Sequence, residues 1–593
     1  MADETENYEF SDVLPLEQVA KLRGAVKHSR LMLEPFRKNR FEAVRQYVGK
    51  HYSDNGSADK VPVNLLALAV LIYRRSLSSR TPKTMISTKV PDLKPSAYSF
   101  ELGLNHLLEE INYKFTLRRV VLDALFSIGI AKVGQSATGG VEIDGVFHDV
   151  GQPYFDHIDL DDWVHDISAK IYEQVQYAGH KFRKPLDYVK ANYANTRNLQ
   201  ASYKEPIEEA TGDDVRSISR GSDRHTDSDE YRQYVDLWEL WLPLENLIVT
   251  LPCAGGPPIS VEEWTGPERG PYHILHFSEV PGQIMPLAPV AAWMDIHDLA
   301  NRLYNKLGRQ AERQRDILGY SGEAADQAKR IGDAGDGEMI QMDQPGSSQE
   351  YKFGGIDQAT LAFVIHNRDL FSWLAGNLDT LGGLSPQAET LGQEELLQGN
   401  TSKMMEDMRD LTQTFNQDVI EDLGSYVWHD PFWDPPIVKK VAGTDIEIAT
   451  TFSPEERAEN DFVEYNFSID PYAAEFRSPA AKLQTMMHVI QNLVIPLAPM
   501  MAEQGIFPNY EGMLRVFAKY TDMSELDEIL TFGGEPMAQR PQTTNPGRPA
   551  VTRRENVRIN KPGRTRRGAD FALSQTLLGG GVQKSEAAAA VGP

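Results

Sequence analysis

The stretch from 357 to 429 constrains the fold of this chain most, because it holds two consecutive long helical patterns. In the second pattern, 393–429, apolar residues follow one line at nearly heptad spacing. These residues are Met404, Met408, Leu411, Phe415, Val419, Leu423 and Val427. A helix of about 35 residues spans roughly 50 Å, more than the diameter of a small domain. We therefore expect its stripe to be buried against other helices or against other copies of the chain.

The first pattern, 357–381, has apolar residues at steps of three and four, which is the period of one helix face. The residues of this face are Leu361, Val364, Ile365, Leu370, Phe371, Leu374 and Leu378. Between the two helical patterns lies a loop, 382–392, with Gly382, Gly383, Pro386 and Gly392. Glycines allow several backbone states, so this loop could change its conformation at low cost.

The length of 593 residues exceeds what one hydrophobic core normally supports, so we expect several domains. The net charge of -25 disfavours a protein that grips nucleic acid over its whole surface, whereas an acidic wall lets a polyanion slide past. The single cysteine, Cys253, excludes an intramolecular disulfide framework, and no signal peptide is visible at the acidic start of the sequence. These features predict a cytosolic protein that does not span a membrane.

The order of patterns along the chain predicts a mixed α+β fold. Helices are expected at 16–52, 63–77, 96–111 and 115–128, with strands near 85–90, 130–133 and 139–150. A polar stretch at 192–229 is typical of an exposed insertion. The strand-rich section 230–280 should contain a hairpin of 234–242 and 247–251, which turns at Asn246, and a third strand at 272–277.

A helix is predicted at 291–317, and its C-terminal half carries basic side chains, among them Lys306, Arg309 and Arg313. The helix dipole explains some of them, and a row of cations facing phosphates is the alternative interpretation. After it, 318–355 should form a compact module, with a short helix at 323–331 and strands at 338–342 and 350–353.

The segment 153–166 is the densest cluster of possible metal ligands in the sequence. A metal-dependent hydrolase could use Asp156, His157, Asp159 and His165 to bind an ion that activates water. The structural alternative is a strand edge followed by an acidic helix start that Asp161 or Asp162 caps. The glycine and distal glutamate of an EF-hand are missing here.

The order of the parts resembles that of portal proteins of tailed double-stranded DNA bacteriophages, over roughly residues 15 to 535. The resemblance is carried by Leu299-Ala300-Asn301-Arg302-Leu303, by Gly337-Glu338-Met339-Ile340 and by Gly383-Leu384-Ser385-Pro386-Gln387-Ala388-Glu389-Thr390. Upstream, Asp123-Ala124-Leu125-Phe126-Ser127-Ile128-Gly129 fits the same family.

The resemblance implies a portal-protein fold assembled as a ring, in which each segment has a part. The parts are a wing at 1–285 with a strand-rich section at 230–280, a stem helix at 286–317, a clip at 318–356, a second stem helix at 357–381, a tunnel loop at 382–392, a long wing helix at 393–429, a wing completion at 430–475, a helical crown at 476–537 and a basic disordered tail at 538–593.

The resemblance also implies the partners and the contact residues. The partners would be eleven or so further copies of the chain, duplex DNA in the channel, the terminase motor, head-tail adaptor and tail proteins, and the major capsid and scaffold proteins. Channel contacts would come from Gly382, Gly383, Leu384, Ser385, Pro386, Gln387, Glu389, Thr390, Lys306, Arg309 and Arg313. Clip contacts would come from Glu323, Asp326, Lys329, Arg330, Glu338 and Gln341. The protein would be assembled in the host cytoplasm and reside at the capsid vertex of the virion.

The tail, 538–593, carries ten basic and three acidic residues, and its composition predicts disorder. On the portal interpretation it would contact packaged DNA through Arg553, Arg554, Arg564, Arg566 and Arg567. No phosphate loop, HExxH, GxSxG or dinucleotide motif is present, so neither a catalytic residue nor a cofactor is predicted. The hydrolase and a helical scaffold protein of another kind stay open as alternatives.

Overall fold

The computed structural model describes residues 10, 13–49, 63–136, 140–143, 146–149, 151–196, 199, 201, 233–320, 322, 325–335, 339, 341, 348–353, 355–381, 391–440, 447–458, 460–469, 487, 491, 492 and 496. The chain divides into two units, Met1–Phe476 and Arg477–Pro593, and the elements below belong to the first. Helices and strands both contribute, which agrees with the predicted α+β class. Of the predicted crown, 476–537, only four isolated positions are described, and the tail lies outside the described residues.

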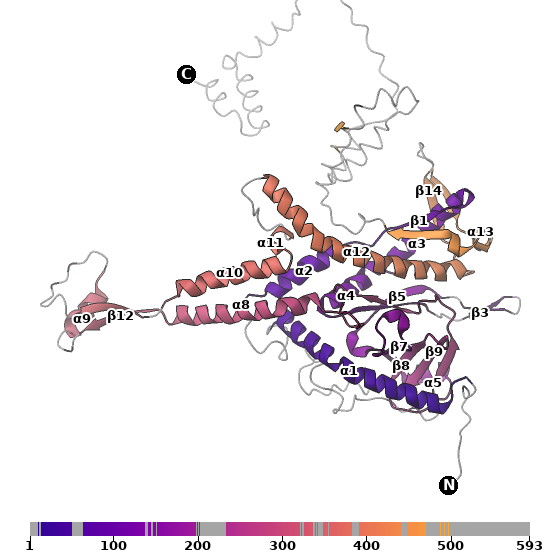
Figure 1. Ribbon diagram of the computed structural model, residues 1–593, viewed down its shortest axis with the longest axis horizontal. Helices are drawn as coiled ribbons and strands as arrows, with labels where there is room; N and C mark the ends of the chain where they lie inside the picture. Colours follow the sequence, from indigo (N-terminus) through magenta and orange to yellow (C-terminus); the bar gives the residue numbers. More distant parts are fainter. Residues whose placement is uncertain are drawn as a thin grey trace, which may run out of the picture. The chain divides into compact units, whose positions relative to one another are not determined.

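The N-terminal part of the chain contains four helices (Figure 1). They are α1 (Leu16–Val48), α2 (Leu65–Leu77), α3 (Lys94–Glu110) and α4 (Tyr113–Phe126), with β1 (Thr84–Thr88) and the short helix η1 (Pro91–Leu93) between α2 and α3. The side chain of Asn64 caps α2 by accepting a hydrogen bond from the backbone N–H of Ala67. Asn112 turns the chain from α3 to α4 with φ 54°, a left-handed conformation that asparagine tolerates. The four predicted helices are confirmed.

An antiparallel sheet has the strand order β10-β9-β8-β7-β6. Its strands are β6 (Trp163–His165), β7 (Ala178–Pro185), β8 (Tyr234–Leu242), β9 (Leu247–Pro252) and β10 (Ser260–Glu263), accompanied by η2 (Leu160–Asp162), η3 (Tyr172–Gln174) and α5 (Leu186–Asn192). The hairpin of β8 and β9 is confirmed, and Asn246 has φ 55° at its turn. The strands β6, β7 and β10 were not predicted. Of the predicted insertion, 192–229, positions 197–198, 200 and 202–229 lie outside the described residues.

A second sheet has the order β11-β2-β5, with β2 (Gly129–Gln135), β5 (Pro153–Ile158) and β11 (Tyr272–Leu275). The predicted third strand is therefore real, but it pairs with β2 rather than with the hairpin. The pair β3 (Gly140–Ile143) and β4 (Val146–Asp149) forms a separate hairpin. Gly129 begins β2 where a Cβ would collide with the backbone oxygen of Val120, so only glycine fits this approach of α4.

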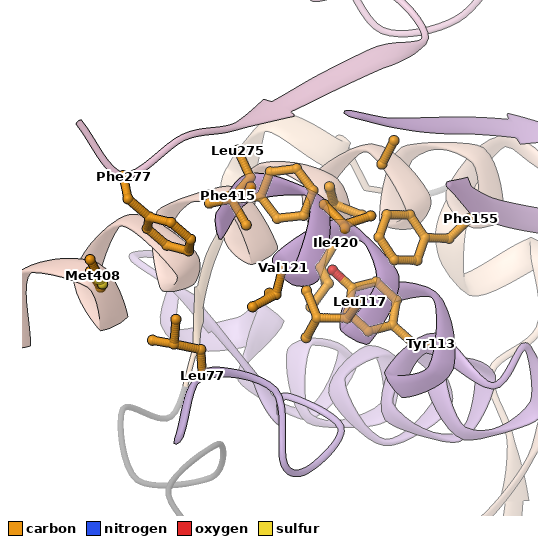
Figure 2. Packing of buried hydrophobic residues seen from close by; sticks show 14 of the residues in the cluster. Leu77, Tyr113, Leu117, Val121, Phe155, Leu275, Phe277, Met408, Phe415 and Ile420 are labelled. Atoms are coloured by element: carbon orange, nitrogen blue, oxygen red, sulfur yellow. The ribbon is translucent and has the colours of Figure 1, made fainter. Parts of the chain in front are cut away.

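The long helix α12 (Leu391–His429) is confirmed and packs on the second sheet. From its predicted stripe, Met408, Phe415, Val419, Leu423 and Val427 are buried. Figure 2 shows this core, in which the rings of Tyr113 and Phe155 stack at 4.4 Å beside Phe415. The Tyr113 hydroxyl donates a hydrogen bond of 2.7 Å to Oδ1 of Asn416, which satisfies a buried polar pair between α4 and α12.

The segment after α12 returns to the N-terminal helices. Its elements are β14 (Pro436–Lys440), β15 (Glu447–Thr451), α13 (Pro454–Ala458), η5 (Phe462–Glu464) and β16 (Tyr465–Ile469). Strand β16 pairs with β1, with Phe467 opposite Ile86, although about two thirds of the chain length separates them. Phe100 of α3 lies at the centre of the aromatic side chains that fill this junction.

The segment 286–381 forms two long helices with a small module between them. Its elements are α8 (Pro289–Glu312), β12 (Arg315–Tyr320), α9 (Ala325–Asp333), β13 (Ser348–Phe353), α10 (Gln358–Leu374) and α11 (Leu378–Leu381). Two predictions are wrong here. The helix predicted to reach 317 ends at Glu312, and the helix predicted for 357–381 breaks after Leu374. Among the helices that the structure describes, none is both long and apolar enough to cross a bilayer.

Candidate functional site

Helix α8 has one buried face, which its sequence explains. Pro289 occupies its first turn, where the missing N–H costs nothing. Val290, Trp293, Ala300 and Leu307 recur at helical steps and are all buried. This face fixes the rotation of α8, so the direction of its remaining side chains is fixed as well.

The basic residues of α8 form one stripe on the opposite side of the helix. Arg302, Lys306, Arg309 and Arg313 stand at positions i, i+4, i+7 and i+11, and all four are exposed. Nothing in the part of the chain that the structure describes forms an ion pair with them at 4 Å or less. The three predicted channel cations, Lys306, Arg309 and Arg313, therefore share one solvent-facing line with Arg302, about 16 Å long at 1.5 Å per residue.

Helix α10 runs antiparallel to α8 (Figure 1). Near one end of the pair, the Asn367 side chain donates a hydrogen bond of 3.2 Å to the backbone oxygen of Ile296. Near the other end, the backbone N–H of Asp357 donates to Oε1 of Gln310 at 3.4 Å. Asp357 also caps α10, and hydrogen bonds from Thr360 hold the pKa of its carboxyl below the usual value.

The apolar residues of α10 do not all face the core, which corrects the prediction of a single face. Val364 and Phe371 are buried, but Leu361, Ile365 and Leu370 are exposed. A second apolar line follows Phe363, Leu370 and Trp373, and their exposed fractions are 48%, 39% and 68%. Its spacing of seven and then three residues was the signal in the sequence that could have revealed this line.

The break between α10 and α11 falls at Ala375, Gly376 and Asn377. Gly376 has φ 76° and Asn377 has φ 56°, both in the left-handed region that ends helices. The Tyr73 hydroxyl of α2 donates a hydrogen bond of 2.9 Å to the Ala375 backbone oxygen, so the break is anchored to the body. The predicted loop residues Gly382, Gly383, Leu384, Ser385, Pro386, Gln387, Glu389 and Thr390 lie outside the described residues.

The module between the helices is built on a two-stranded sheet. Strand β13 pairs with β12, so Arg315 to Ile317 belong to a strand instead of the end of the predicted helix. In α9, Asp326, Lys329 and Arg330 are exposed, while Ala328 is buried. Gln341 is exposed too, and Glu323 and Glu338 lie outside the described residues. Of the strand predicted at 338–342, only 339 and 341 are described, and neither belongs to a strand.

Two carboxylates of segment 153–166 and one from α4 surround an arginine. The Arg40 guanidinium from α1 lies 3.6 Å from Asp123, 2.5 Å from Asp159 and 3.7 Å from Asp161. Burial works against the charged form, but the carboxylates outweigh it and raise the pKa of Arg40. Sequence reasoning missed Arg40, since its partners are 83 or more positions away.

The residues of the hydrolase interpretation have separate partners. Asp156 is exposed on β5, and His157 Nε2 lies 2.7 Å from Asp123. His165 accepts a hydrogen bond from the indole N–H of Trp163, and burial lowers its pKa to about 4. Asp159, not Asp161 or Asp162, caps the short helix η2. Across the ranges that the structure describes, no three His, Cys, Asp or Glu side chains are placed to hold a metal ion.

Comparison with known proteins gives no family assignment. No protein-family model matches this chain, and the search of curated proteins finds no significant match.

Proposed function

We propose that this chain is the portal protein of a tailed double-stranded DNA bacteriophage, a ring at the capsid vertex through which DNA is packaged and ejected. The observation that carries the proposal is the antiparallel pair α8 and α10, which exposes a line of cations on one helix and an apolar line on the other. The cation line of α8 could contact a polyanion, and the apolar line of α10 could contact a neighbouring copy of the chain.

The apolar line supports self-association. Fully burying a large apolar side chain contributes about 1.5–3 kcal/mol, and Phe363, Leu370 and Trp373 are each about half exposed, so covering them would contribute about 2–5 kcal/mol to each contact. Because the exposed line lies away from the buried face of α10, a second copy can cover it without disturbing the contact with α8. A ring forms when this line docks on a different surface of the next copy and the rotation between copies closes around an axis.

The cation line supports DNA as the content of the channel. Each copy contributes four exposed cations over about 16 Å, so a ring of copies would present one belt of positive charge to the phosphates of a duplex. The chain as a whole is acidic, with a net charge of -25. A belt of cations at one level of an otherwise acidic wall attracts a polyanion there and leaves it free to slide past the rest of the wall, which packaging and ejection both require.

On this proposal α8 and α10 form the stem, and 318–356 forms the clip that docks the terminase motor and later the head-tail adaptor and tail proteins. Loop 382–392 faces DNA, the crown and the basic tail face the head interior, and the major capsid and scaffold proteins surround the wing. The protein is then a structural ring of about twelve copies rather than an enzyme.

The first test is the mass of the purified protein by native mass spectrometry and light scattering, with negative-stain images. We expect a ring of about twelve copies of the 66.5 kDa chain with a central hole. The double variant F363E/W373E should give smaller species, because it places charges in the subunit contact. Leu244→Glu is the matched control, since Leu244 is 79% exposed in the turn between β8 and β9. A monomeric wild-type protein would overturn the proposal.

A second experiment tests whether the cation line of α8 contacts DNA. Charge reversal at Arg302, Lys306 and Arg309 should leave the ring mass unchanged and reduce the retention of duplex DNA at low salt. Rings that retain DNA equally well after this reversal would contradict the assignment of the cation line.

A further inference from the structure

A second concentration of positive charge lies where α2 ends against α4. The described segment 63–91 contains five basic residues and no acidic one, and 111–122 contains three basic residues and no acidic one. They are Arg74, Arg75, Arg80, Lys83, Lys89, Lys114, Arg118 and Arg119. In a chain with a net charge of -25, this local excess needs an explanation.

One hydrogen bond brings these residues together. Nε of Arg118 donates to the backbone oxygen of Ser78 at 3.2 Å, which places α4 beside the C-terminal end of α2. Arg74 and Arg75 lie one turn before Ser78, and Arg80 lies two residues after it. We call Arg74, Arg75, Arg80, Arg118 and Arg119 the arginine cluster. The dipole of α2 favours cations in its last turn, but it does not account for those on α4.

Exposed apolar side chains border the arginine cluster. Phe115 is 60% exposed and precedes Arg119 by four residues, so both lie on one face of α4. Leu71 is 38% exposed and precedes Arg75 by four residues on α2. A surface for phosphates needs no such side chains, whereas arginine together with aromatic and aliphatic groups is typical of protein interfaces.

We propose that the arginine cluster, with Phe115 and Leu71, docks an acidic face of a second copy of this chain. This inference rests on the proposed function, because it assumes that the chain self-assembles. Copies that each carry -25 repel one another, and a contact that places opposite charges face to face offsets this repulsion. The described surface offers acidic groups for this role, such as Glu406, Asp407 and Asp410 on α12.

The test is assembly of the full-length variant R75E/R119E, measured by light scattering over a concentration series at low and high salt. The concentration at half-assembly should rise about tenfold or more at low salt. The matched control K27E/K170E makes the same charge change at exposed lysines elsewhere and should stay near wild type. Circular dichroism checks that both variants fold.

The outcomes separate the two proposals. A wild-type protein that does not assemble overturns the proposed function and, with it, this inference. Wild type and R75E/R119E that assemble alike overturn only the inference. Unchanged assembly with weaker retention of duplex DNA would also overturn it, because the arginine cluster would then be a nucleic-acid surface.

A photo-crosslink gives a second readout, because Cys253 is the single cysteine. In the variant L71C/C253S, a benzophenone attached at position 71 should form adducts between chains that map to an acidic peptide. Assembled particles that yield only adducts within one chain would contradict the docking of a second copy at this surface.

Discussion

Replacing Arg40 by methionine should destabilise the protein strongly, because Arg40 is the cation that three carboxylates share. The side chains of Asp123, Asp159 and Asp161 are 15%, 25% and 8% exposed, and that of Arg40 is 4% exposed. Removing one partner of such a buried group leaves unpaired charges, which costs about 3–5 kcal/mol. The loss should therefore appear as a clear drop in the urea midpoint at pH 7.

The pH dependence of this loss identifies its cause. Without Arg40, burial and mutual repulsion disfavour the charged form of the three carboxyls in the folded state. The penalty is then present at neutral pH and is relieved as pH falls and the carboxyls take up protons. The deficit of R40M relative to wild type should accordingly shrink between pH 7 and pH 4.

Two further variants serve as controls. Lys38→Met removes an exposed pair with Glu34 on the same helix and should cost less than about 1 kcal/mol. R40M/D159N removes one carboxylate and should recover part of the loss. A deficit of R40M below about 1 kcal/mol at pH 7, or one that does not vary with pH, would refute the reasoning.

Two other predictions concern the body of the protein. Burial lowers the pKa of His165, His180 and His297 to about 4, below the unfolded value of about 6.5. The stability that these neutral histidines contribute is present above pH 6.5 and is lost as pH falls toward 4. The free energy of unfolding should drop by up to about 1.4 kcal/mol per pH unit for each histidine. A urea midpoint that does not change between pH 6.5 and 4 would contradict this prediction. Gly179→Ala should cost about 1–3 kcal/mol in urea unfolding, because the added methyl meets the Glu239 backbone oxygen and Leu240. Gly24→Ala, in open space on α1, should instead be neutral or stabilising, and equal effects of the two would disprove the steric argument.

Long periodic helices were predictable from the sequence because local pattern and tertiary burial agree in them. The stripe of α12 is an example, since Met408, Phe415, Val419, Leu423 and Val427 are buried and Leu411 is partly buried, as the heptad spacing implies. At 315–317 the local pattern and the tertiary contacts disagree. Arg315, Asp316 and Ile317 continue the helical pattern, but pairing with β13, more than 30 positions away, makes the segment a strand.

Charged positions with distant partners were not predictable. Strand β7 carries Lys181 and Arg183, which hides it from a search for apolar alternation. Both side chains pair with Asp236 of the neighbouring strand, at 3.7 Å and 2.6 Å. The acidic segment 153–166 was misleading for the same reason. A metal site and the surroundings of a buried arginine both need several nearby carboxylates, and the sequence does not show that Arg40 lies among them. The sequence predicts basic residues on α8 and apolar residues on α10. That the exposed ones form a cation line on α8 and an apolar line on α10 follows only from how the two helices pack.

Helix α2 joins the features on which the two proposals depend. The ring of its Tyr73 lies 5.3 Å from the ring of Trp293 on α8. The Tyr73 hydroxyl donates a hydrogen bond to the backbone oxygen of Ala375, at the break between α10 and α11. Burial raises the pKa of Tyr73 to about 12, so the hydroxyl keeps its proton and stays a donor at neutral pH. The arginine cluster begins at the next residue. A second copy docked at the arginine cluster would therefore contact α2, the helix that packs against α8 and is hydrogen-bonded to the end of α10. Assembly and the geometry of the channel would then depend on the same buried contacts of α2.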